Sequence, residues 1–151
     1  MPDKKKKPRI RPLAICIIMH EGKTLVSENF DTVKQQQFYR PLGGGIHFGE
    51  NGRDAILREI TEETGQQALD IVYIGVLENI FICEGEPGHE IVLVYRGRIK
   101  DERFYNMVGS LPPCVESNGE IISLKWVPLD EFATGRKILY PDGLLQLVLP
   151  A

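Results

Sequence analysis

The sequence predicts one α+β domain, in which a mixed sheet and one central helix form an α+β or α-β-α layered arrangement. Three observations indicate this class. Short apolar runs bounded by Gly, Pro, Asn or Asp recur along the chain, and one segment near its middle changes to helical spacing. A length of 151 residues, with 42% hydrophobic and 26% charged residues, suits one globular domain that buries its own core.

The first eleven residues differ from the rest in charge. Lys4 to Lys7 form a run of like charges that Arg9 and Arg11 extend, and few apolar residues accompany them. We expect residues 1–11 to be a basic, disordered tail and residues 12–151 to form the single domain. The net charge of −3 leaves the domain itself acidic, which argues against a general nucleic-acid binder.

Apolar runs predict the strands of the sheet. Residues 13–19 and 24–27 form two strands around a turn, and residues 37–42 form a third that ends at Gly43-Gly44-Gly45. Residues 71–76, 80–83, 91–95 and 121–127 give four more, with Trp126 in the core. Residues 144–149 fit either a short terminal helix or an edge strand.

The cellular location is predicted to be cytoplasmic. Every apolar run is shorter than the roughly 20 residues needed to cross a bilayer, and the basic N-terminus lacks the apolar segment of a signal peptide. Cys16, Cys83 and Cys114 are odd in number and far apart, which does not fit a disulfide framework. We therefore expect reduced thiols and no contact with a membrane.

Residues 51–64 carry the signals of a helix. Asn51 is a suitable N-cap with Asp54 three residues later, and Gly65 stands where a left-handed residue would end the helix. On this helix Glu59 and Glu63 lie one turn apart with Glu62 beside them. Such like charges destabilise an isolated helix by roughly 0.2–0.5 kcal/mol per pair, which a divalent cation would offset. Ligands with only oxygen donors suit Mg²⁺ or Mn²⁺.

The residues before the helix favour a site over a solvated acidic face, in which Arg58 and Glu62 would be an ordinary i,i+4 pair. Gly43-Gly44-Gly45 permits close approach of backbone to a phosphate, and Glu50 points a fourth carboxylate toward the same end. Arg58 can hold a carboxylate in a fixed orientation through its planar fork of donors.

Together these residues resemble the Nudix box. Its defined positions match in Gly44, in Glu50 after five intervening residues, and, after seven more, in the run Arg58-Glu59-Ile60-Thr61-Glu62-Glu63-Thr64-Gly65. Only Gln66 departs, since an aliphatic residue is usual there. Outside the defined positions, Leu42 and His47 replace a proline and an acidic residue that are often found. With residues 122–132, which resemble a strand and short helix of the family, the likeness covers about residues 12–135.

The resemblance implies the Nudix fold, an α-β-α sandwich with a central mixed sheet and a loop-helix-loop that carries the box. It also implies Mg²⁺, with Mn²⁺ as a substitute, held by Glu59 and Glu63 with Glu62 close by. Arg58 would orient these groups, Glu50 would be an accessory ligand and Gly44 a backbone contributor. Many members add a loop glutamate as base or ligand. Glu120 is the best placed candidate, with Glu116 and Glu90 as rivals.

The function implied is hydrolysis of the pyrophosphate bond in a nucleoside diphosphate linked to another group, such as a nucleoside triphosphate, nucleotide sugar or ADP-ribose. Residues 78–81 and 84–90 are expected to form the specificity loop and its strand. The predicted catalytic residues are Glu59, Glu62, Glu63, Arg58 and Glu120; the metal ligands are Glu59, Glu63, Glu62, Glu50 and Gly44; the substrate contacts are Gly44, Gly45, Arg40, Tyr39 and Phe81.

Two other functions stay open. One is a nucleotide-binding or regulatory module without turnover, which the intact carboxylates disfavour. The other is an RNA 5′-end pyrophosphohydrolase, for which the Lys4–Lys7 run is the support, although a free basic tail is usually a solvated arm. The expected partner is a small nucleotide rather than a nucleic acid, and homodimerisation is left open.

Overall fold

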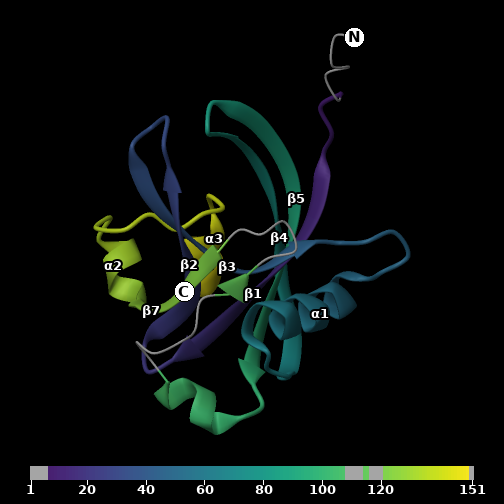
Figure 1. Ribbon diagram of the computed structural model, residues 1–151, viewed down its shortest axis with the longest axis vertical. Coiled ribbons are helices and arrows are strands. Elements are labelled where there is room, and N and C mark those ends of the chain that lie inside the picture. The colour runs from purple at the N-terminus through teal and green to yellow at the C-terminus, as the bar shows by residue number, and fades with distance from the viewer. Residues whose placement is uncertain (1–6, 108–113, 116–120, 150–151) are drawn as a thin grey trace.

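The computed structural model describes residues 7–107, 114–115 and 121–149 (Figure 1). Its elements are, in order, β1 (Arg11–His20), β2 (Lys23–Asp31), β3 (Gln36–Gly45), α1 (Gly52–Thr64), β4 (Ala68–Cys83), β5 (Glu86–Ile99), the 3₁₀ helix η1 (Glu102–Asn106), β6 (Cys114–Val115), β7 (Ile121–Pro128), α2 (Leu129–Ala133) and α3 (Leu144–Val148). No helix within these ranges is both long and apolar enough to span a membrane.

Seven strands form one mixed sheet in the order β4-β5-β1-β3-β2-β7-β6. Strand β1 runs parallel to β5, and the other pairings among the described strands are antiparallel. Strand β3 is shared, because its residues 36–41 pair with β2 and its residues 42–45 pair with β1. The sheet therefore divides along β3, and the β2–β3 and β4–β5 hairpins extend from it as two separate ribbons (Figure 1).

The core has layers on both faces of the sheet. On β1, Ala14, Cys16 and Ile18 pack toward α1, whereas Leu13, Ile15 and Ile17 pack on the other face toward α3. This alternation follows from the two-residue period of a strand, and burial on both faces explains why β1 is almost continuously apolar. Helix α2 covers a third cluster beside β2, β3 and β7. The predicted α+β arrangement with layered helices is confirmed (Figure 1).

Both ends of α1 agree with the prediction. The Asn51 side chain accepts a hydrogen bond from the Asp54 backbone N–H at 2.9 Å, and Gly65 adopts φ 69° with its N–H donated to the Thr61 carbonyl. Such an N-cap stabilises a helix by roughly 1 kcal/mol. Local sequence therefore fixes where the acidic helix begins and ends.

Other elements differ from the prediction. The runs predicted as separate strands at residues 71–76 and 80–83 belong to one strand, β4, because β5 offers an unbroken partner along it. The pairing with β5 shifts register between Leu69 and Val72 and again between Tyr73 and Gly75. The extra residues at these two points are accommodated without ending the strand. Residues 144–148 are helical, and β1 begins at Arg11, the last residue of the predicted tail.

Two buried side chains of the sheet, Cys16 and Trp126, lie in the core as the sequence indicated. Cys16 is a buried free thiol whose pKa burial raises to about 12, so it stays protonated and inert. Trp126 is buried in the core beside Phe104 and Tyr105 of η1 and is not available to stack on a nucleobase.

Candidate active site

Arg58 is the centre of a hydrogen-bond network where β3, the following loop and α1 meet. Its Nε and one terminal nitrogen donate to the two oxygens of Glu50 at 3.0 and 2.9 Å. The same nitrogen donates to the Gly45 carbonyl at 3.0 Å, and the other donates to Glu59 at 2.8 Å. Glu62 lies 3.5 Å away as an i,i+4 partner. One planar guanidinium thus fixes strand, loop and helix relative to one another.

Glu50 is held as a carboxylate by this network. Its hydrogen bonds from Arg58, and a further one from the His47 backbone N–H at 3.1 Å, lower the pKa of Glu50 from 4.5 to about 2. Glu50 in turn raises the pKa of Arg58 above its already high ordinary value. The pair therefore stays ionised throughout the neutral range, and the orienting role predicted for Arg58 has a geometric basis.

The glycines bring bare backbone against the two helix carboxylates. A Cβ at Gly44 would lie 2.6 Å from Oε1 of Glu59, so a larger residue would displace that carboxylate. The Gly43 N–H donates to Glu63 at 3.1 Å, and Gly43 has φ 146° with only 2.1 Å between an added Cβ and the Ala14 carbonyl oxygen. Glu59 and Glu63 are consequently both seated on the end of β3.

The helix carboxylates differ in exposure. Glu63 is 7% exposed and the Glu59 side chain 13%, whereas the Glu62 side chain is 58% exposed and reaches solvent. Across the described residues, no three Asp, Glu, His or Cys side chains form a group that could hold a metal ion. Arg58 and the Gly43 N–H hold Glu59 and Glu63 instead, so the predicted sector of three carboxylates exists on α1 without forming a closed ligand cage.

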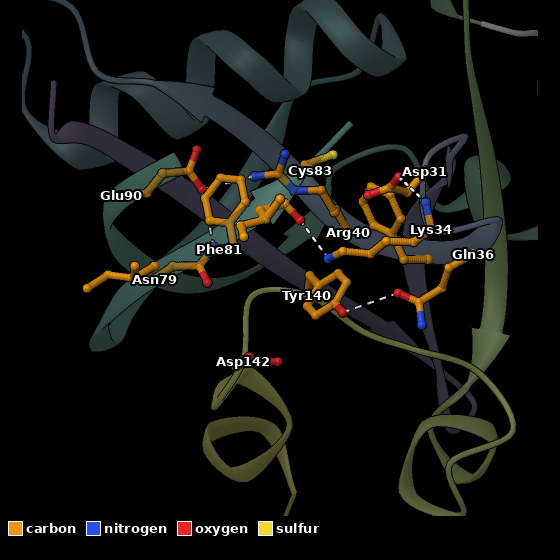
Figure 2. A pocket seen from close by; sticks show the side chains of 13 residues that line it. Asp31, Lys34, Gln36, Arg40, Asn79, Phe81, Cys83, Glu90, Tyr140 and Asp142 are labelled. Carbon is orange, nitrogen blue, oxygen red and sulfur yellow. Dashed lines mark hydrogen bonds and ion pairs between the residues drawn. The ribbon is translucent and has the colours of Figure 1, made fainter. Parts of the chain in front are cut away.

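A pocket of about 180 Å³ lies between the β2–β3 and β4–β5 hairpins. Figure 2 shows Phe81, Asn79 and Glu90 on one side of it, Asp31, Lys34 and Gln36 on the other, and Arg40 extended between them. Tyr140 and Asp142 line it from the segment before α3. Its walls carry Phe38, Phe81 and Tyr140 as aromatic residues, with charged side chains of both signs between them.

Two of the residues predicted to contact substrate lie in this pocket. Phe81 and Arg40 line it, but Tyr39 is 4% exposed and packs edge-on against Phe132 in the core. Its ring faces are covered, contrary to the prediction that it contacts substrate. Because neighbouring strand residues point to opposite faces, Phe38 lies in the pocket in place of Tyr39. Asn79 belongs to the predicted segment 78–81, but Phe38 and Tyr140 were not predicted, since no local pattern marks them.

The inner end of the pocket contains a buried carboxylate. Glu90 is 3% exposed and accepts a hydrogen bond from the Asn79 amide at 3.3 Å. Guanidinium nitrogens of Arg40 and Arg11 lie 3.6 and 3.9 Å from its oxygens. Of the three candidates for the loop glutamate, only Glu90 can be placed, because Glu120 and Glu116 lie outside the described residues.

At the opposite end of the pocket, the tips of the two hairpins are bonded together. Glu84 accepts hydrogen bonds from the Thr32 backbone at 2.8 Å and from the Thr32 hydroxyl, and its own N–H donates to Asp31 at 3.2 Å. The Lys34 ammonium donates to the Ile82 carbonyl at 2.6 Å. Three backbone N–H groups, led by that of Lys34, lower the pKa of Asp31, which keeps this joint charged.

Comparison with known proteins settles the family. A family model described as "NUDIX domain" matches residues 10–145, which include the α1 network and every residue that lines the pocket. The chain belongs to the Nudix family. The predicted Nudix fold and enzyme class, a Nudix pyrophosphohydrolase, are confirmed.

Relatives and solved structures agree with this Nudix assignment. The chain is 28% identical to an RNA pyrophosphohydrolase of Bartonella quintana (strain Toulouse), with 82% of this chain and 78% of the relative covered. It is 29% identical to one of Bartonella clarridgeiae, with 85% and 82% covered. A Nudix hydrolase structure from Nitrosomonas europaea superposes with a TM-score of 0.66 at 17% identity, over 93% of this chain and 86% of that one.

Nudix hydrolases generally use divalent cations, and the side chains around α1 suit such an ion in donor chemistry. The side-chain donors are all carboxylate oxygens, which hard cations prefer. The Glu59 carboxylate occupies the space that a side chain at Gly44 would fill, so it lies against bare backbone. The fit is one of donor chemistry, because the described carboxylates do not converge into one metal-binding group.

Proposed function

We propose that this Nudix hydrolase performs Mg²⁺-dependent hydrolysis of the pyrophosphate bond in a nucleoside diphosphate linked to another group. The observation that carries the proposal is the Arg58 network, which seats Glu59 against Gly44 and keeps Glu50 ionised. A network of this kind holds acidic groups in place before substrate arrives, which lowers the cost of ordering them during the reaction.

In the proposed mechanism Glu59 and Glu63 would hold the cation, with Glu62 beside them and the Gly44 backbone as a further oxygen ligand. Bound Mg²⁺, for which Mn²⁺ can substitute, would neutralise charge on the phosphate oxygens and lower the pKa of an attacking water. Glu62, the most exposed of the three carboxylates, accepts the proton of that water. Attack at phosphorus forms one P–O bond and breaks the bridging P–O bond, releasing a nucleotide and a second phosphorylated product.

Arg58 and Glu50 act on this reaction through position. Both Glu50 oxygens already accept hydrogen bonds from Arg58, so Glu50 contributes more as the anchor of Arg58 than as a metal ligand. Arg58 in turn fixes the Glu59 carboxylate and the Gly45 carbonyl. A displacement of about 1 Å in such groups can reduce turnover about a hundredfold.

The pocket between the hairpins is the proposed nucleoside site. Its volume and its aromatic residues Phe38, Phe81 and Tyr140 suit a nucleobase, which is flat and stacks on aromatic rings. Arg40 faces the same space and would contact phosphate. We place the nucleoside in this pocket and the pyrophosphate between it and α1.

The test is release of phosphate and nucleotide from a panel of nucleoside triphosphates, oxidised nucleotides, nucleotide sugars, ADP-ribose and dinucleoside polyphosphates, with Mg²⁺, with Mn²⁺ and with neither. We expect Glu63→Gln to keep the fold and to lower kcat by orders of magnitude, because it replaces a charged carboxylate ligand of the cation with a neutral amide. Glu102→Gln, an exposed carboxylate on η1, is the matched control and should leave turnover unchanged. Near-normal turnover in Glu63→Gln would refute the assignment.

A second candidate substrate is the 5′ end of RNA. It is favoured by the two Bartonella relatives, both of which are named RNA pyrophosphohydrolases. An RNA oligonucleotide with a 5′-triphosphate therefore belongs in the panel. If RNA is the substrate, deletion of residues 1–7 should weaken binding and flatten its salt dependence, because fewer phosphate contacts release fewer counterions. Binding that is unchanged by the deletion would contradict a role for the tail.

A further inference from the structure

We propose that Arg11 and Arg40, spaced by the buried carboxylate of Glu90, form a phosphate subsite between the nucleoside pocket and α1. This inference deepens the proposed function, because it names the residues that receive the phosphate nearest the nucleoside. Arg11 and Arg40 would bind the anion directly, and Glu90 would be a positioning residue.

The position of Arg11 follows from the sheet. Strand β1 lies between β5 and β3, where Arg11 is opposite Glu90 of β5 and Leu13 is opposite Gly45 of β3. A terminal nitrogen of Arg11 lies 3.9 Å from Glu90, and another lies 3.6 Å from the position that a Cβ of Gly45 would take. Arg11 therefore extends from the pocket wall to the glycine segment that Arg58 contacts.

The charge of the cluster indicates an anionic ligand. Two guanidinium groups surround one carboxylate, which leaves a net charge of +1 at the inner end of the pocket. The contacts of 3.6 and 3.9 Å are longer than hydrogen bonds, so donors of both arginines are left over for a ligand. Planar guanidinium groups match phosphate oxygens in a forked geometry, which makes phosphate the chemical group that fits.

The buried position of the Glu90 carboxylate supports its role in positioning the two arginines. A carboxylate that is 3% exposed is costly unless charged or polar groups compensate it, and here Asn79 and the two arginines do so. The Glu90 carboxylate in turn reduces the repulsion between Arg11 and Arg40, which lie next to each other on neighbouring strands. Without it, we expect Arg11 and Arg40 to separate and to need reordering when phosphate binds.

The test measures binding by calorimetry, with EDTA present so that metal binding at α1 does not contribute. The probes are ADP and adenosine, which share a nucleoside and differ in phosphate. We expect wild-type protein to bind ADP more tightly than adenosine. Arg11→Gln and Arg40→Gln should each weaken ADP binding by roughly tenfold, since each removes charged hydrogen bonds to phosphate. Arg11 lies outside the pocket lining, so Arg11→Gln should leave adenosine binding unchanged. Arg103→Gln, in an exposed pair with Asp101, is the control.

Glu90→Gln separates positioning from charge. In this variant the cluster of Arg11, Arg40 and residue 90 would carry a net charge of +2. If charge alone decided the affinity, the variant would bind ADP more tightly than wild type. Because the side chains of Arg11 and Arg40 are 64% and 37% exposed, solvent and salt screen that effect, and we expect weaker ADP binding and a higher KM with kcat unchanged. Tighter or unchanged ADP binding in Glu90→Gln would overturn the positioning role.

The outcomes also distinguish this proposal from the one on which it rests. Equal affinity of wild-type protein for ADP and adenosine, or ADP binding that is insensitive to Arg11→Gln, would overturn the subsite while metal-dependent turnover lost in Glu63→Gln still supported the enzyme. ADP binding that depends on Arg11, in a protein that hydrolyses nothing in the panel, would support the subsite and overturn the hydrolytic function.

Discussion

The α1 network and the pocket are built from the chain in opposite ways. Every partner of Arg58 lies within 13 residues of it, and the Gly43–Glu63 bond spans 20 residues. The hairpin tips beside the pocket join Thr32 to Glu84 across 52 residues, and the Gln36–Tyr140 contact within the pocket spans 104. The groups proposed to catalyse the reaction are thus placed by one loop and one helix, whereas the pocket depends on the pairing of two hairpins and on the segment before α3.

This difference explains which part of the function the sequence predicts. A helix of known period converts the spacing of Glu59 and Glu63 directly into a shared face. No such conversion exists for the pocket, because strand pairing and register decide which residues meet. The residues proposed for catalysis therefore lie in one short segment, whereas the residues proposed to bind the nucleoside come from three.

The largest expected effect tests how closely Gly44 and the Glu59 carboxylate pack together in the α1 network. Gly44→Ala would place a Cβ 2.6 Å from Glu59, so we expect that carboxylate to shift and kcat to fall by about a hundredfold. The adjacent change Gly45→Ala meets its nearest atom, an Arg11 nitrogen, at 3.6 Å and should cost less than about tenfold. Steady-state kinetics on the preferred substrate measures both, and equal losses would show that Glu59 has room to move.

An intermediate effect is expected in the pocket. Gly88→Ala would place a Cβ 2.3 Å from the Phe81 ring and push that ring into the pocket, so KM should rise several-fold while kcat is kept. Gly97→Ala on the same strand is the control, since its Cβ would meet Ile71 at 2.5 Å, away from the pocket. It should reduce thermal stability without a change in KM. A fall in kcat for Gly88→Ala would mean that the pocket and α1 are not separable.

The smallest effect concerns pH. Since the pKa of Glu50 is lower in the folded chain than its ordinary 4.5, Glu50 stabilises the fold fully above about pH 4.5, and this contribution disappears as pH falls toward about 2. Glu50→Gln should therefore lower the urea midpoint at pH 6 and narrow its difference from wild type below pH 3. Urea titrations at several pH values measure this. A difference independent of pH would mean that the charge of Glu50 does not contribute.

Much of the α1 region could be predicted because its signals are local. Asn51, Asp54 and Gly65 mark the helix ends by capping chemistry, and Arg58 reaches its partners within two turns and the preceding loop. The metal ligand set predicted on this helix stays a prediction, as does the role of Glu120.

Only part of the pocket, including Arg40 and Phe81, could be predicted, and two other residues illustrate why the rest could not. Tyr39 and Phe38 are adjacent aromatic residues, and only the register of β3 decides that Phe38 faces the pocket. Arg11 was assigned to the basic tail because of the charged residues around it. In the structure it pairs with β5 and lies in the sheet opposite Glu90. Long-range pairing outweighs local composition at both positions.

If a nucleotide binds in this pocket as proposed, the joined hairpin tips would couple its binding to folding. The pocket walls come from segments before α1, after α1 and near α3, so the proposed site is complete only in chains in which all three are in place. A ligand that binds the native state alone raises its stability by about 2.7 kcal/mol at a hundred times Kd. Thermal denaturation with a library of nucleotides can therefore rank candidate substrates before any product is assayed, and variants that loosen the tips should show a smaller ligand-dependent rise in melting temperature.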